Sequence, residues 1–213
     1  MPQSTTSARA ADDGTSATTA TLARALRAGD RGAFASLYGR FARPLRALLL
    51  VQAAVRDVDD LLQESFLAAW RHRAALRDEA RFAPWLFAIG RSVARAARRR
   101  WRVDGSGEGA SGDGRAVQVA PEQLAAPGAE QAAQHAAERA EVLAALRALP
   151  ESYRETLALR LIEGRSGPEI AELTGLTHGS VRVNLHRGME LLRERLGAAA
   201  PRARVDRAEG RSG

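Results

Sequence analysis

The sequence predicts an all-α protein of two small helical domains joined by a flexible linker, with a helix-turn-helix in the C-terminal domain. Apolar residues recur at helical spacing in residues 21–102 and 140–197, and no strand-like alternation extends beyond a few residues. Aromatic residues make up only 5% of the 213-residue chain, so the core must be built from Leu, Val and Ala, which favours closely packed helices. Residues 103–139 form the expected linker. Their first part is rich in glycine, and helical spacing resumes near Ala129.

Both ends of the chain lack periodic apolar positions. Residues 1–20 are rich in Ser, Thr and Ala, and residues 198–213 have nothing to pack against, so we expect two disordered tails. The N-terminus has no apolar signal segment, and no apolar run is long enough to span a bilayer. These features predict a cytoplasmic protein without membrane insertion, and we expect a monomer when it is free.

The composition also excludes several kinds of chemistry. The chain has no cysteine, which excludes disulfides, thiolate metal sites and cysteine nucleophiles, and its four histidines are scattered. No carboxylate cluster lies beside a histidine, and no glycine-rich phosphate loop is present. We therefore expect no catalytic residue, no metal site and no cofactor.

Positive charge is concentrated in the first domain. The net charge is +7 and every cationic side chain apart from histidine is an arginine. Residues 21–102 hold 17 arginines against 7 acidic residues, whereas residues 141–197 are balanced. This distribution predicts a polyanion as a partner of the first domain.

Residues 166–197 have the pattern of a helix-turn-helix. Ser166 and Glu169 match a capping box at a helix start, Gly175 suits the left-handed backbone of a tight turn, and Thr177 can cap the next helix. The second helix carries an apolar stripe: Val181, Leu185, Met189, Leu192 and Leu196. Its polar N-terminal residues then form the opposite face, as in a helix that enters the major groove. An ordinary helical hairpin with a solvated face is the alternative.

Two earlier helices, around Leu146 and over residues 153–161, precede this unit. We expect their apolar residues to cover the back of the recognition helix: Leu157, Leu159, Leu161 and Ile162.

Residues 56–73 contain a cluster of acids within the basic domain. Leu62, Phe66, Ala69 and Trp70 form the expected buried stripe, which leaves Asp60, Gln63 and Glu64 on an exposed face. One interpretation of these acids is compensation of the helix dipole, which Asp57 and Asp59 could provide; the other is a protein-docking surface.

Residues 81–102 contain a stripe of arginines. Arg91, Arg95, Arg98 and Arg102 share one helical face, which Arg99 and Arg100 broaden. Such a face either binds a polyanion or is simply solvated. Trp85, just before it, is expected in the core rather than stacked on a base.

Taken in order, these stretches resemble a bacterial group-four sigma factor of the extracytoplasmic-function (ECF) type, in the sigma-70 family. DVDDLLQESF, from Asp57 to Phe66, is similar to the family's core-polymerase-binding motif D-A-E-D-L-V-Q-E-T-F. Residues 81–100 resemble the segment that reads and melts the −10 promoter element, and residues 149–196 resemble the domain that reads the −35 element. The chain departs from the family pattern at Ser92, Ala96, Val183 and Asn184, so the promoter sequence is not predicted.

The resemblance implies a non-enzymatic protein with three binding surfaces. The acidic face implied to dock on core RNA polymerase consists of Asp57, Asp60, Gln63 and Glu64. The arginine face implied to bind the −10 region consists of Arg91, Ser92, Arg95, Arg98 and Arg99. The reading face implied to contact the −35 region consists of Thr177, Ser180, Arg182, Val183, Asn184, His186 and Arg187. The partners it implies are core polymerase, promoter DNA and an anti-sigma factor, and residues 71–81 are the implied loop for a flipped-out base.

Two other classes remain open at this point. A dimeric helix-turn-helix repressor or activator accounts for the C-terminal half but leaves the acidic face unexplained. An enzyme acting on nucleic acid is disfavoured because the catalytic groupings named above are absent from the sequence.

Overall fold

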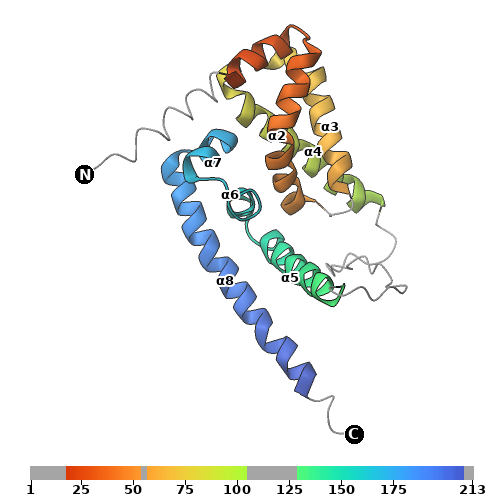
Figure 1. Ribbon diagram of the computed structural model, residues 1–213, viewed down its shortest axis with the longest axis vertical. Helices are drawn as coiled ribbons and strands as arrows, with labels where there is room; N and C mark the ends of the chain where they lie inside the picture. Colours follow the sequence, from red (N-terminus) through yellow and green to blue (C-terminus); the bar gives the residue numbers. More distant parts are fainter. Residues whose placement is uncertain (1–17, 54–56, 105–128, 209–213) are drawn as a thin grey trace, which may run out of the picture.

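The computed structural model describes residues 18–53, 57–104 and 129–208, and every regular element in these ranges is a helix (Figure 1). The N-terminal unit comprises residues 18–27, α2 (Arg31–Gln52), α3 (Val58–Arg71), two 3-10 turns (Arg73–Ala75 and Glu79–Arg81) and α4 (Phe82–Asp104). The C-terminal unit comprises α5 (Ala129–Arg147), α6 (Glu151–Leu161), α7 (Gly167–Thr174) and α8 (His178–Ala208). The predicted all-α class is confirmed.

Several helices extend into segments that we expected to be tail or linker. The first helix begins at residue 18, α5 begins at Ala129 within the expected linker, and α8 continues to Ala208. Alanine, the best helix former, is the commonest residue in residues 129–139 and 198–208, so α5 and α8 include positions where the apolar spacing is absent. The rest of the expected tails and linker, residues 1–17, 105–128 and 209–213, lie outside the described residues.

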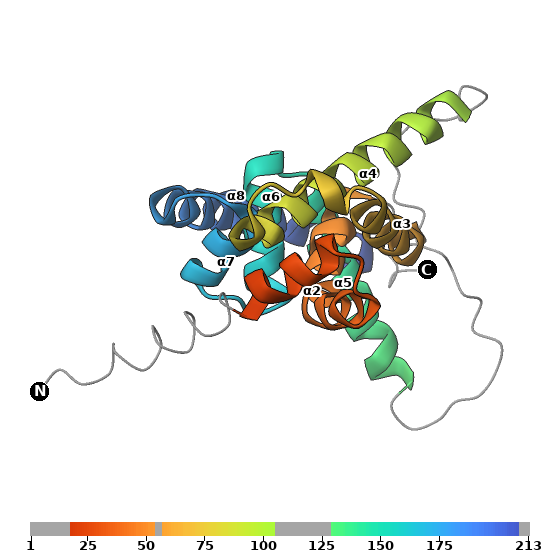
Figure 2. The ribbon, with the colours of Figure 1, turned by 90° about the horizontal axis from the view of Figure 1, so that it is seen from above.

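The N-terminal unit is a bundle of α2, α3 and α4 around a dense apolar core. Phe82 and Phe87 of α4 are completely buried, and Phe41 of α2 packs against Phe82 with a ring-centroid separation of 5.4 Å. The two helices approach closely at Gly90, where an added Cβ would lie 2.7 Å from Cδ1 of Leu45. This bundle fixes the direction of α4, whose far end extends well beyond the other helices (Figure 2).

The C-terminal unit contains the predicted helix-turn-helix, and its local signals are confirmed. Ser166 and Glu169 form a capping box at the start of α7. Gly175 ends α7 with φ +76°, in the left-handed region that favours glycine. At the start of α8, the amide of Ser180 donates to Oγ1 of Thr177 over 3.1 Å. The turn between α7 and α8 is therefore determined by capping residues that lie within a few positions of it.

One part of the expected packing is wrong. Leu157 and Leu159 are completely buried, but Leu161 and Ile162 are 44% and 38% exposed. They lie at the last residue and the C-cap of α6, so the chain turns away before they can reach the recognition helix.

The two units pack directly against each other. Figures 1 and 2 show α6 between α8 and the N-terminal helices. Leu159, Ile170 and Leu173 join the core of the N-terminal unit, while Val51 of α2 joins the core of the C-terminal unit. Each of the two apolar cores thus contains residues from both units.

Candidate functional site

The acidic face lies on α3. Asp60 and Gln63 are exposed, Glu64 is half-exposed, and the half-buried Asp57 stands at the helix start. Glu64 forms an ion pair with Arg100 of α4 over 3.4 Å. The face therefore keeps accessible polar groups at Asp60 and Gln63, while Glu64 is held in place by a neighbouring helix.

Leu67 extends this face and was missed by the sequence reasoning. It is 55% exposed, the largest value among the large apolar side chains that the structure describes as exposed. Its position follows Gln63 by four residues and Asp60 by seven, which places all three along one side of α3. This spacing from Gln63 and Asp60 is visible in the sequence and could have placed Leu67 on the acidic face. An exposed leucine among polar groups adds an apolar contact to the surface.

The arginine face lies on α4 and divides into two parts. Ser92 and Arg99 are exposed, whereas Arg91 and Arg98 are half-buried. Arg95 is exposed and lies 3.6 Å from the Glu151 carboxylate of α6. The structure therefore brings the five predicted residues together on one helix but leaves only some of them accessible.

Arg91 is the most constrained member of the arginine face. Its Nη1 donates to Oε1 of Glu155 over 2.7 Å, and the two side chains are 21% and 11% exposed. Burial raises the pKa of Glu155, and the charge and hydrogen bond of Arg91 oppose that rise. Glu155 belongs to the C-terminal unit, so this pair joins the two units at the arginine face.

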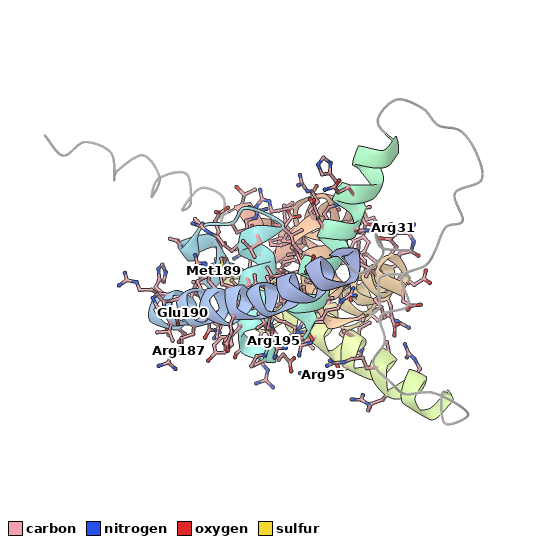
Figure 3. The ribbon with its side chains drawn as sticks, turned by 90° about the horizontal axis from the view of Figure 1, so that it is seen from below. Arg31, Arg95, Arg187, Met189, Glu190 and Arg195 are labelled. Carbon is pink, nitrogen blue, oxygen red and sulfur yellow. The ribbon has the colours of Figure 1, made fainter. Side chains whose placement is uncertain are left out.

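The reading face begins at the cap of α8. The Thr177 and Ser180 hydroxyls lie 2.8 Å apart, so both help to shape the first turn of the helix. Arg182, Val183 and Arg187 follow on the exposed side, and Val183 is 46% exposed. Figure 3 shows Arg187 with Glu190 and Arg195 along α8. These exposed groups lie opposite the apolar stripe that holds α8 on α6.

Two members of the reading face make contacts within the chain. His186 is exposed, and its Nδ1 lies 3.4 Å from the carboxylate of Glu190. Asn184 is half-buried, and its Nδ2 donates to the carbonyl oxygen of Ser152 on α6 over 3.2 Å. A bidentate contact of Asn184 with adenine would require this hydrogen bond to be released.

Side-chain contacts and hydrogen bonds hold the segment between α3 and α4 in place. The Arg73 guanidinium lies 4.6 Å from the Trp70 ring centroid and donates to the Trp70 carbonyl. Asp78 caps the second 3-10 turn by accepting from the amide of Ala80. Trp85 is half-buried and packs on Phe82, in agreement with a core role.

Comparison with protein families decides the class of protein. The family model for sigma-70 region 2 matches residues 37–103, and the model for sigma-70 region 4 matches residues 139–192. The chain belongs to the sigma-70 family of RNA polymerase sigma factors. The first match covers the acidic and arginine faces, and the second covers α6 and the helix-turn-helix. This sigma factor is a transcription initiation factor and not an enzyme. It binds core RNA polymerase and recognises promoter elements.

The relatives of this chain include an ECF RNA polymerase sigma-E factor of Haemophilus influenzae, 28% identical over 185 residues, which is 82% of this chain and 93% of that protein. The chain is 34% identical to RNA polymerase sigma factor CarQ of Myxococcus xanthus over 175 residues, which is 80% of this chain and 93% of CarQ. It is 40% identical over 148 residues to RfaY of Xanthomonas campestris, a probable RNA polymerase sigma factor, with 68% of this chain and 36% of that protein covered. The chain thus spans only about a third of the length of RfaY.

A solved structure of CnrH in complex with the cytosolic domain of CnrY is similar in fold. The TM-score is 0.57 at 28% identity, with 84% of this chain and 97% of that chain covered. Within the part of our sigma factor that the structure describes, no helix has the length and hydropathy needed to cross a membrane.

Proposed function

We propose that this sigma factor docks on core RNA polymerase through the acidic face of α3, extended by Leu67. The observation that carries the proposal is an exposed run of Asp60, Gln63 and Leu67 on one side of a helix, within a unit that is otherwise strongly basic. Carboxylate and amide oxygens accept hydrogen bonds from a cationic partner helix, and the leucine contributes apolar contact. Asp57 and Glu64 flank this run.

We assign promoter binding to the other two faces. The arginine face supplies charge for the phosphates of the −10 region, through Arg91, Ser92, Arg95, Arg98 and Arg99. The reading face approaches the major groove of the −35 region with Arg182, Val183, His186 and Arg187, and Thr177 and Ser180 hold the helix start. Arginine can bond guanine, while Val183 suits a thymine methyl group. Asn184 takes part once its bond to Ser152 is released.

The remaining assignments concern the cellular location of the protein, its oligomeric state and its regulator. We propose that the protein works in the cytoplasm, as a monomer until it meets core polymerase. An anti-sigma factor is its proposed regulator, and the similarity to CnrH, which was solved with the cytosolic domain of CnrY, supports a protein partner of that kind.

Reversal of a single charge tests the docking assignment. The Asp60→Arg variant should bind core polymerase at least about tenfold more weakly. The exposed carboxylate attracts the cationic partner helix, whereas an arginine at the same position would repel it. The matched control is Glu194→Arg, an equal charge change at an exposed position of α8. Binding of a fluorescently labelled sigma factor to core enzyme measures the effect, and circular dichroism checks the helix content. Equal affinities of the two variants would overturn the docking assignment.

A further inference from the structure

Residues 72–81, which join α3 to α4, combine a buried anchor with exposed arginines. Leu76 is only 2% exposed and belongs to the apolar core of the N-terminal unit. Arg77 and Arg81, which follow this anchor, are exposed. Arg81 also lines an open cavity of about 330 Å³ together with Arg91 of the arginine face. The exposed groups of this segment therefore adjoin the surface that we assign to the −10 region.

The two 3-10 turns of this segment are single short turns. One is closed by the amide of Ala75, which donates to the His72 carbonyl over 2.8 Å. The other is closed by the amide of Arg81, which donates to the Asp78 carbonyl over 3.1 Å. A segment held by isolated turns samples several conformations unless side chains from other elements fix it, and a binding surface built on a loop depends on such support.

The first 3-10 turn is supported by Arg73. Its guanidinium lies 4.6 Å from the ring centroid of Trp70, and its Nη1 donates to the Trp70 carbonyl over 2.9 Å. The Trp70 ring in turn packs against Phe34 of α2, with a centroid separation of 5.3 Å. Nη2 of Arg73 also lies 3.9 Å from the position of a Cβ built on Gly29. Arg73 therefore contacts both the end of α3 and the turn that follows the first helix.

The second 3-10 turn is supported by Glu79. Its Oε1 accepts a hydrogen bond over 2.5 Å from Nη1 of Arg27, the last residue of the first helix. The Glu79 side chain is 19% exposed and that of Arg27 is 42% exposed. The Asp78 carboxylate caps the same turn by accepting from the amide of Ala80 over 3.0 Å. The start of this turn is thus fixed locally, whereas the position of Glu79 depends on the first helix.

Both supports come from one short stretch, residues 27–29, at the end of the first helix. Figure 1 shows this helix in red beside the yellow segment that leads into α4. Ala23 and Leu26 of the helix are buried in the core of the N-terminal unit, so the helix is itself firmly anchored. The family model for sigma-70 region 2 begins at residue 37, so this support lies before the matched part of the chain.

We propose that Arg27 is a positioning residue for −10 recognition, which acts through Glu79 on residues 72–81. The first helix holds this segment in one conformation, so Arg77 and Arg81 are presented to the promoter strand in a fixed geometry. A preorganised surface selects among the bases of a flexible single strand at a smaller cost in conformational entropy. Loss of the contact between Arg27 and Glu79 should therefore reduce discrimination among −10 sequences. This inference rests on the proposed −10 role of the N-terminal unit.

Selection from a promoter library tests the proposal. The full-length protein is assayed as holoenzyme on promoters with a randomised −10 element and on promoters with a randomised −35 element. Arg27→Ala should lower the −10 preference by about threefold to fivefold, as expected for a partly exposed ion pair, and leave the −35 preference and the melting temperature unchanged. The matched control is Arg31→Ala, which removes an equal charge at an exposed position four residues away. A −10 preference equal to that of the control would overturn the proposal.

A charge exchange shows whether the contact itself is required. Arg27→Glu and Glu79→Arg each place like charges at the contact and should weaken the −10 preference further than Arg27→Ala does. The Arg27→Glu/Glu79→Arg variant restores opposite charges and should recover most of the wild-type preference. A variant that only disturbs folding would not be rescued by a second charge change. A double variant no more selective than the single variants would overturn the positioning role.

Hydrogen exchange of the free protein separates failure of the positioning from failure of the −10 assignment. The amides of Ala75, Ala80 and Arg81 are bonded within the segment, so their exchange reports how firmly it is held. Arg27→Ala should speed exchange over residues 72–81 at least about threefold, and Arg31→Ala should match the wild type.

Unchanged exchange in Arg27→Ala would overturn the positioning role. Faster exchange with an unchanged −10 preference would overturn the role of residues 72–81 in promoter recognition. If Arg99→Ala on the arginine face still weakened promoter binding in that case, the proposed −10 function of α4 would stand while this inference fell.

Discussion

Arg147 of α5 donates two hydrogen bonds to the carbonyl oxygen of Leu50, from Nε at 2.9 Å and from Nη2 at 2.7 Å. Leu50 lies in the last turn of α2, where carbonyl groups have no partner within the helix. Arg154 of α6 adds a longer bond, 3.4 Å, to the carbonyl of Val51. The C-terminal unit therefore caps a helix of the N-terminal unit, and its cations favour the negative end of that helix dipole.

The Arg147→Ala change should lower the free energy of unfolding by about 1–3 kcal/mol, because a carbonyl in the packed interface loses its charged donor. Arg139→Ala, on an exposed position of the same helix, should have little effect. Urea denaturation of the full chain, followed by circular dichroism, measures both. A loss of equal size at Arg139 would show that helix charge, rather than the cap of α2, explains the effect.

Two glycines of α8 should respond to alanine in opposite directions. At Gly188 a Cβ would lie 2.9 Å from Leu157 and 3.1 Å from Tyr153, so Gly188→Ala should destabilise the protein by about 1–3 kcal/mol. At Gly197 nothing lies within 4 Å, so Gly197→Ala should stabilise the helix by up to about 1 kcal/mol. Thermal melts of both variants compare them. Stabilisation at Gly188 would mean that α6 and α8 have room to separate.

Glu169 gives stability a defined pH dependence. Burial opposes ionisation, but hydrogen bonds from Ser166 and Arg165 outweigh it and lower the pKa of Glu169 from 4.5 to about 2. A lowered carboxylate pKa contributes stability that is present above pH 4.5 and is lost as the pH falls towards 2. The stability difference between wild type and Glu169→Gln should therefore shrink over that window. Glu141→Gln, at an exposed position, is the control, and melts at several pH values test the trend. A difference that stays constant between pH 4.5 and 2 would contradict the capping-box assignment.

Promoter preference should depend on Arg187, whose exposed side chain lies on the reading face. Arg187→Ala should cost about 1–3 kcal/mol on the preferred −35 sequence and much less on promoters altered at the contacted base. Holoenzyme binding to a promoter library measures this, and Arg193→Ala, exposed further along α8, serves as the control. A uniform loss across all promoters would instead indicate a phosphate contact.

The arginine face should determine the affinity for promoter DNA and its salt dependence, rather than the promoter preference. Arg99→Ala removes an exposed guanidinium that has no part in the α6 ion pairs, so it should weaken binding to every promoter. The log–log slope against salt should fall by up to about one unit for one lost phosphate contact. Measurements at several salt concentrations would contradict this if only the sequence preference shifted.

The elements that the sequence predicted well are those with local causes. The capping box at Ser166, the left-handed Gly175 and the cap at Thr177 each involve residues within a few positions of one another, so sequence spacing is sufficient. The same holds for most of the predicted buried stripe of α3: Leu62, Phe66 and Ala69 are buried as expected, whereas Trp70, next to the end of the helix, is only half-buried.

The packing of the two units had no such local signal. Arg91 and Glu155 are 64 positions apart, and Arg147 and Leu50 are 97 apart. Each residue alone resembles an ordinary surface charge or a helix-terminal carbonyl, and nothing in the spacing pairs them. The sequence therefore predicted which residues form the arginine face but not that α6 holds two of them.

The orientation of α8 has a consequence for how this protein can be redesigned. Its helix-turn-helix turns Val183, His186 and Arg187 outward, while the opposite side of the same helix rests on α6. Apart from Asn184, which bonds the Ser152 carbonyl, the groups assigned to promoter recognition and the groups that pack on α6 therefore lie on different sides of one helix. Substitutions on the outer side can generate variants that recognise distinct promoters yet keep the same packing against α6, which is the property required of orthogonal regulators in one cell.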